Sequence, residues 1–127
     1  MLKEAVICII IVVAIFSLDI FTQGYTKKTT QEITEILIGV KEELLKEDKT
    51  QIENKIKELD EGWYEKRDKL AYYIEHDELE KVDTAIVAMK SYVETEDYSS
   101  AIEEIEEGKF ILEHIQKKNA FNLENIF

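Results

Sequence analysis

From Tyr25 onward, apolar residues recur at steps of three and four positions in four successive stretches, with Glu and Lys filling the positions between them. This spacing puts the apolar side chains on one face of an α-helix, because a helix turns once in about 3.6 residues. No stretch of strand length alternates between apolar and polar residues. The pattern predicts helices over residues 26–46, 50–74, 78–95 and 98–118 and an all-α fold.

Large apolar residues form the predicted seam of each helix, and Trp63 occupies one of these core positions. The seams contain Ile33, Ile36 or Leu37, Val40 and Leu44; Ile52, Ile56, Leu59, Trp63 and Leu70; Leu79, Val82, Ile86, Met89 and Val93; and Ala101 or Ile102, Ile105, Leu112 and Ile115. A shift of roughly 49 residues aligns the first two seams with the last two. We therefore expect two antiparallel helical hairpins, packed as a four-helix bundle or a short solenoid.

Polar breaks separate the predicted helices. Each break contains a residue able to cap a helix and a glutamate three positions later: Thr50 with Glu53, Asp77 with Glu80, and Ser100 with Glu103. These pairs are typical of capping boxes and predict where the helices begin. Between the apolar run and the first predicted helix, Gly24 is the only residue that disfavours a helix, and there is no proline. The two segments can therefore form one continuous helix.

The run Ala5–Leu18 contains no charged residue, and Asp19 follows it directly. As a helix it measures about 21 Å, or about 26 Å when it is extended through Asp19 to Phe21, short of the ~30 Å hydrocarbon core of a bilayer. A carboxylate at its end can reach the headgroups. We expect residues 1–24 to be a transmembrane anchor and residues 25–127 an acidic helical domain with an apolar C-terminal tail. The predicted anchor positions are Ala5, Ile9, Val12 and Phe16.

Two other interpretations of this run stay open, namely a cleaved signal peptide and a buried helix of a soluble protein. Residues 22–24 make a mediocre cleavage site, which favours the uncleaved anchor. Lys3 on one flank and Lys27 and Lys28 on the other give almost no charge bias. The resemblance of the start to a signal-anchor favours a single-pass protein of the cell membrane whose domain is extracytoplasmic.

Charge and cysteine content exclude several functions. The 28 acidic and 16 basic residues give a net charge of −12, which opposes binding to nucleic acids. The single cysteine, Cys8, lies in the apolar run and supports neither an internal disulfide nor a cysteine-rich zinc site. The expected partners are the bilayer and another membrane or envelope protein.

The two histidines are the only candidates for metal binding, and their surroundings do not support it. Glu-x-x-His, the metal-binding pattern of helical bundles, would need a glutamate three residues earlier, where Tyr73 precedes His76 and Ile111 precedes His114. His76 and Glu80 can pair across one helical turn, which does not complete a coordination shell. We therefore expect no metal and no cofactor, with His76, Glu80 and His114 as weak metal candidates.

Catalytic patterns are missing from the sequence as well. The serines have no base at a recognisable spacing, and no Gly-x-Ser-x-Gly elbow occurs. The carboxylates of residues 103–107 lack the Asp-x-Asp-x-Asp-Gly pattern of a calcium loop and are expected to form a solvated helix face. We expect no catalytic residue and no enzyme activity.

Four large apolar residues lie within the last seven positions, namely Phe121, Leu123, Ile126 and Phe127. A free terminus does not normally expose such residues. The tail is therefore expected either to fold back on the bundle or to dock into a partner.

Several segments resemble one known family. The apolar start that ends in FTQ, Trp63 with Lys66, Arg67 and Lys69, the segment IEHDEL and the closing LEHIQKKNAFNLENIF are similar to the domain of unknown function 4363 family. The resemblance implies a small single-pass protein of clostridia-like bacteria, with an uncleaved anchor and a helical domain, and implies no activity or cofactor. Together these observations predict a membrane-anchored, non-catalytic protein-interaction module. The alternative is an extracytoplasmic ligand- or metal-binding sensor domain.

Overall fold

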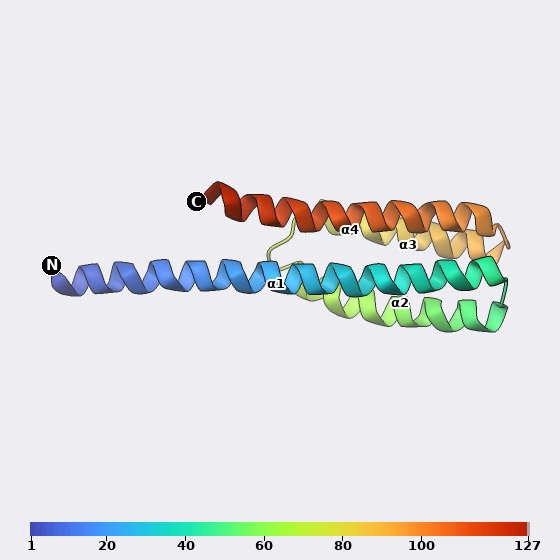
Figure 1. The fold of residues 1–127 in the computed structure, drawn as a ribbon, viewed down its shortest axis with the longest axis horizontal. Helices are drawn as coiled ribbons and strands as arrows, with labels where there is room; N and C mark the ends of the chain where they lie inside the picture. The colour runs from blue at the N-terminus through green and yellow to red at the C-terminus, as the bar shows by residue number, and fades with distance from the viewer. Residues whose placement is uncertain (127) are drawn as a thin grey trace.

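The computed structural model of the chain describes the backbone of residues 1–126 and the side chains of residues 1–120. Its regular elements within residues 1–126 are four helices, which confirms the all-α prediction (Figure 1). They are α1 (Leu2–Lys46), α2 (Lys49–Leu70), α3 (His76–Glu94) and α4 (Tyr98–Ile126).

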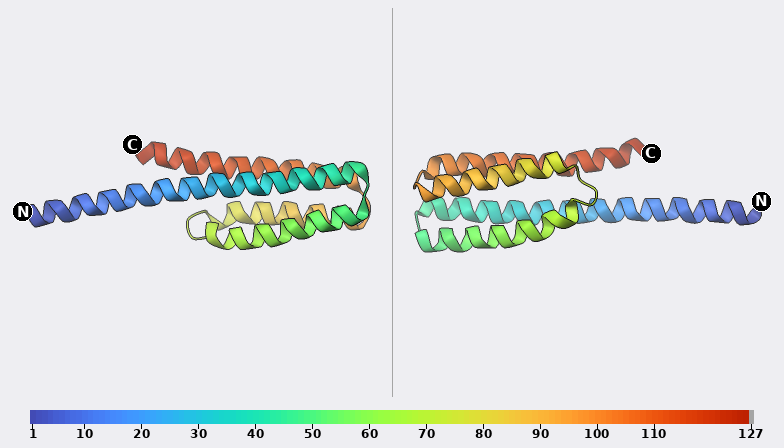
Figure 2. Two further views of the ribbon diagram at one scale, coloured as in Figure 1. Left: turned by 60° about the horizontal axis from the view of Figure 1, so that its bottom comes forward. Right: turned by 180° about the vertical axis from the view of Figure 1, so that it is seen from behind.

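Helix α1 contains both the apolar run and the first seam of the bundle in 45 unbroken residues. At about 1.5 Å per residue it is about 68 Å long. Gly24 lies inside the helix, and a Cβ built there would meet no atom within 4 Å. The expected continuation of the apolar run into the first bundle helix is therefore confirmed. The N-terminal part of α1 projects beyond the other helices (Figures 1 and 2).

The four helices close into a bundle rather than extending as a solenoid. Helix α1 packs against both α2 and α4, and α4 also packs against α3. Side chains join α2 to α3: Trp63 Nε1 donates to Asp83 Oδ1 at 2.7 Å, Arg67 Nε donates to Asp83 Oδ2 at 2.7 Å, and Lys90 Nζ donates to Asp60 Oδ2 at 2.8 Å. Each helix therefore contacts two neighbours (Figure 2).

The core consists of most residues of the predicted seams, whereas the seam residues Ile56 and Val93 are partly buried and pack against it. Trp63 is fully buried, in agreement with its predicted core position. Around it lie aliphatic side chains with at most 3% of their surface exposed: Ile33, Leu37, Val40, Leu44, Ile52, Leu59, Leu70, Leu79, Val82, Ile86, Met89, Ala101, Ile105, Leu112 and Ile115. Burial of this apolar surface is the main stabilising contribution to the bundle.

The two turns at the end of the bundle remote from the N-terminus have the same backbone geometry. Glu47 and Glu96 adopt left-handed conformations, with φ of 56° and 59°. The amide after each donates to a carbonyl of the preceding helix, Asp48 N to Glu43 O at 3.4 Å and Asp97 N to Tyr92 O at 2.9 Å. This matched geometry occurs where the roughly 49-residue shift aligns the two Glu-Asp pairs.

The predicted capping boxes are wrong at all three positions. Asp48 caps α2 by accepting from Gln51 N at 3.2 Å, and Asp97 accepts from Ser100 N at the same distance. Both aspartates precede the predicted cap residues because the left-handed glutamate lets the next helix start immediately. Helix α3 has Glu75 at its cap position, with no side-chain cap hydrogen bond.

The boundaries of α2, α3 and α4 also differ from prediction. Helix α2 ends at Leu70, and residues 71–74 form a turn in which Ile74 N donates to Leu70 O at 2.8 Å. Helix α3 begins at His76, two residues before the predicted start at 78. Helix α4 continues to Ile126, past the predicted end at 118, because it runs back along α1 beyond the start of α3 (Figure 1).

Candidate functional site

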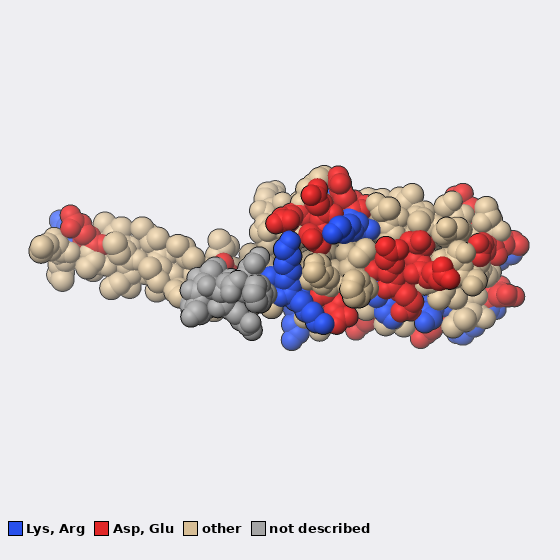
Figure 3. All heavy atoms as spheres, turned by 90° about the horizontal axis from the view of Figure 1, so that it is seen from above, with Lys and Arg blue, Asp and Glu red and all other residues tan. Residues whose placement is uncertain are grey.

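The N-terminal half of α1 is a continuous apolar surface that the described residues of the bundle leave open. Ile9 has 62% of its surface exposed and Val12 48%. Ala5 is exposed as well, while Phe16 is half-buried. Charged side chains cover much of the visible face of the bundle, whereas the projecting segment shows few of them between its tip and its base (Figure 3).

Within residues 1–126, α1 is the one helix that is long and apolar enough to cross a membrane. This conclusion rests on length and composition, and a signal sequence near the N-terminus would satisfy the same criteria. The four predicted anchor positions all lie on this helix. Their side chains are not part of the apolar core of the bundle.

A buried polar cluster lies between the projecting segment and the apolar core. Thr26 is fully buried, and its hydroxyl donates to Thr22 O at 2.7 Å. The Tyr73 hydroxyl lies 2.7 Å from Thr26 Oγ1, and Asn119 Nδ2 donates to the same oxygen at 3.3 Å. Thr30 Oγ1 donates to Gln116 Oε1 at 3.3 Å. We use the name neck for the polar cluster formed by Thr22, Thr26, Thr30, Tyr73, Gln116 and Asn119. The neck joins α1, the turn before α3 and the end of α4.

Burial raises the pKa of the Tyr73 hydroxyl above its usual value. The sequence interpretation missed the neck because it followed apolar residues only. Thr26, Thr29 and Thr30 continue the seam of Ile33 at helical spacing, and that pattern was the available signal.

Replacing Thr26 with valine is expected to lower the free energy of unfolding by about 1–3 kcal/mol, because the partly buried Tyr73 and Asn119 both lose their hydrogen-bond partner. Thr84→Val is the matched control. Thr84 makes the same kind of bond, to Glu80 O at 2.9 Å, but on an exposed surface. Its substitution should change stability by less than about 0.5 kcal/mol. Urea unfolding in detergent measures both, and equal losses would contradict a stabilising neck.

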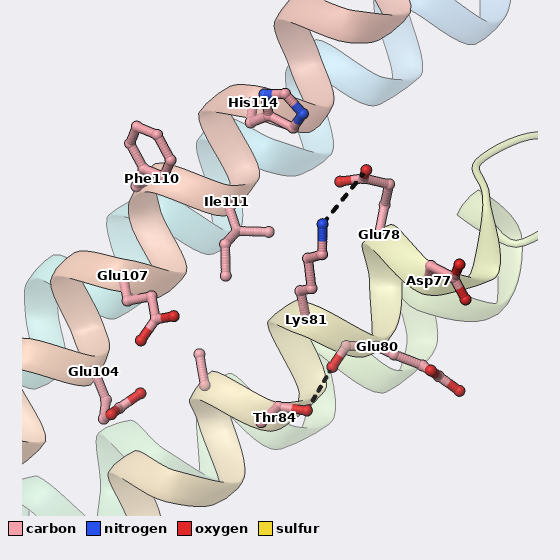
Figure 4. A pocket seen from close by; sticks show the side chains of 11 residues that line it. Asp77, Glu78, Glu80, Lys81, Thr84, Glu104, Glu107, Phe110, Ile111 and His114 are labelled. Carbon is pink, nitrogen blue, oxygen red and sulfur yellow. Dashed lines mark hydrogen bonds and ion pairs between the residues drawn. The ribbon is translucent and has the colours of Figure 1, made fainter.

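A groove of about 840 Å³ lies between α3 and α4 (Figure 4). Its acidic side chains are Asp77, Glu78, Glu80, Glu104 and Glu107. The other lining residues are Lys81, Thr84, Ala85, Phe110, Ile111 and His114. Helix α4 thus supplies an apolar strip and two carboxylates, while α3 supplies three carboxylates and one lysine.

Two features of the groove are electrostatically unfavourable. Burial and the negative charge of Glu107 raise the pKa of the Glu104 carboxyl. Glu78 is 7% exposed, and its Oε2 is buried without a hydrogen-bond partner among the described residues. Glu104 and Glu107 belong to the stretch predicted as a solvated face, and their position in a groove was not foreseen.

Of the three weak metal candidates, His76 and Glu80 contact each other, and His114 lies on another helix. His76 Nε2 is 3.1 Å from Glu80 Oε1 across one turn of α3, as the spacing allowed. His114 belongs to α4 and lines the groove with Glu80. In the part of the chain that the structure describes, no group of three or more His, Cys, Asp or Glu residues is arranged to hold a metal ion.

The predicted docking tail consists of Phe121, Leu123, Ile126 and Phe127. Their side chains lie outside the described residues.

Fold and surface define the class of this protein, an all-α bundle whose first helix is a candidate membrane span. The chain belongs to the family described as Domain of unknown function (DUF4363), whose sequence profile matches residues 20–126. This match confirms the family resemblance and covers the whole bundle. No curated protein and no solved structure matches the chain at a significant level.

Proposed function

We propose that this protein is a membrane-anchored helical module that binds another membrane or envelope protein and performs no catalysis. The observation that carries the proposal is the division of α1 into two halves. Its first half exposes an apolar surface, and its second half supplies a seam of the bundle core. A continuous helix between them would hold the bundle at a defined distance from the bilayer.

The contacts of α1 support a membrane boundary near residues 19–22. The exposed apolar side chains extend to Phe21, which is 69% exposed. The polar neck begins with the Thr22 carbonyl, to which Thr26 donates. A helix from Ala5 to Phe21 is about 26 Å long, and a modest thinning of the bilayer accommodates the difference from ~30 Å.

The proposed interaction function is supported by the groove between α3 and α4, which is lined by charged and apolar side chains. The non-catalytic part rests on the sequence, which has no nucleophile and base at a recognisable spacing. The same groove favours the alternative, an extracytoplasmic sensor domain for a small ligand, because pockets of this size hold small molecules.

The test of anchoring and orientation uses one labelled cysteine in the full chain. In a Cys8→Ser background, Tyr64→Cys places a thiol on α2, where Tyr64 is 49% exposed. We expect the full-length chain to stay in membranes through alkaline carbonate extraction. We also expect an impermeant maleimide to label it in intact cells.

A shortened chain in the soluble fraction would show that residues 1–24 are a signal peptide and would overturn the anchor. Labelling only after the cells are permeabilised would place the bundle in the cytoplasm and overturn the extracytoplasmic orientation.

A further inference from the structure

The groove between α3 and α4 has the dimensions and the chemical pattern of a binding surface for a peptide segment. It runs from Asp77 to Ala85 on α3 and from Glu104 to His114 on α4. These stretches are about 12 Å and about 15 Å long. A helical partner segment of roughly ten residues would match the longer one. Phe110, which lies in the groove, has 70% of its surface exposed (Figure 4).

The charge of the groove is complementary to a basic partner. Five carboxylates line it, and Lys81 is the only lysine or arginine among its lining residues. Glu104 and Glu107 stand one helical turn apart on α4, and burial together with the negative charge of Glu107 raises the pKa of the Glu104 carboxyl. A cation between them would offset that negative charge.

Glu78 provides a second, independent observation at the end of the groove nearer to the neck. The residue is 7% exposed, and its Oε1 forms two ion pairs that are each longer than a hydrogen bond. Lys81 Nζ is 3.8 Å and Lys118 Nζ 3.6 Å from Glu78 Oε1. Oε2 is buried without a hydrogen-bond partner in the described part of the chain. An unsatisfied buried carboxylate oxygen is costly, and a donor arriving from a ligand would lower that cost.

We propose that this groove binds a basic amphipathic segment of a partner protein, with lysine or arginine side chains at Glu78 and at the Glu104–Glu107 pair and apolar side chains on Phe110. A bare metal ion does not fit, because the described residues contain no group of three ligands. A small polyamine would leave Phe110 uncovered. The inference rests on the interaction part of the proposed function and does not depend on the orientation in the membrane.

The test places a photo-crosslinking amino acid at position 110 of the full chain in the membranes of the cells that make it. Position 64 on α2, exposed and outside the groove, is the matched control site. We expect a protein adduct from position 110 and none from position 64. Mass spectrometry should place the crosslink in a segment that carries at least two basic residues beside apolar residues at helical spacing.

Charge variants test the electrostatic part. Glu104→Gln with Glu107→Gln is expected to reduce the adduct about tenfold, because the cation contact at this pair is lost while the one at Glu78 remains. Glu61→Gln with Glu65→Gln changes the net charge equally on an exposed face of α2 and should leave the yield unchanged. Glu107→Gln alone, at an exposed position, serves if circular dichroism shows that the double variant is unfolded.

The outcomes separate this inference from the proposed function. An adduct from position 64 but not from 110 would overturn the groove and leave the interaction module standing. No protein adduct from either site would overturn both. A crosslink from position 110 to lipid alone, or to an acidic segment, would overturn the inference, and so would an equal loss of yield in the two double-charge variants.

Discussion

Trp63→Ala is expected to lower the free energy of unfolding by about 3–5 kcal/mol, a large loss for a single substitution. Trp63 is fully buried and contributes the largest side chain of the core. Its truncation leaves a cavity and also removes the donor to Asp83 Oδ1. Because Asp83 also accepts from Arg67, the substitution disturbs the polar contact that joins α2 to α3.

Two further variants divide this loss into its causes. Trp63→Phe keeps an aromatic ring and removes the N–H donor, so a loss of about 1–2 kcal/mol is expected. Tyr64→Ala removes the neighbouring aromatic side chain, which is 49% exposed, and should cost less than about 1 kcal/mol. Urea unfolding followed by far-ultraviolet circular dichroism in detergent measures all three. A Trp63→Ala loss no larger than that of Tyr64→Ala would contradict the central position of Trp63.

Ile9→Asp combined with Val12→Asp is expected to abolish stable membrane insertion. Each carboxylate near the middle of the span costs about 2.5–3.5 kcal/mol, so the pair opposes insertion by more than about 5 kcal/mol. Most of the full-length chain should then appear in the carbonate supernatant. The bundle should stay folded, because neither side chain belongs to its core.

The matched control carries the same two charges on the bundle. Leu45→Asp and Val87→Asp replace apolar residues that are 66% and 59% exposed on α1 and α3. This variant should remain in the membrane pellet, because its added charges lie outside the apolar run. If the Ile9–Val12 variant also resisted extraction, the apolar half of α1 would not be what holds the protein in the membrane.

The sequence alone determined the helical class, the seams and the apolar run. These properties are local, because a helix repeats every 3.6 residues or so and its buried face is visible in the spacing of Ile33, Leu37 and Val40. Trp63 was assigned to the core for the same reason. The family was also evident from short segments of the chain, and the match over residues 20–126 confirms it.

Tertiary structure decided which helices face one another, and therefore which polar residues acquire a role. Thr26 is buried because α4 and the turn containing Tyr73 pack against it, 47 and more positions away in the sequence. Glu78, Glu104 and Phe110 share a groove only because α3 and α4 pack side by side. Spacing within one helix shows on which face a side chain lies. Whether that side chain is buried or repelled depends on the helix packed against it, and only the tertiary structure determines which helix that is.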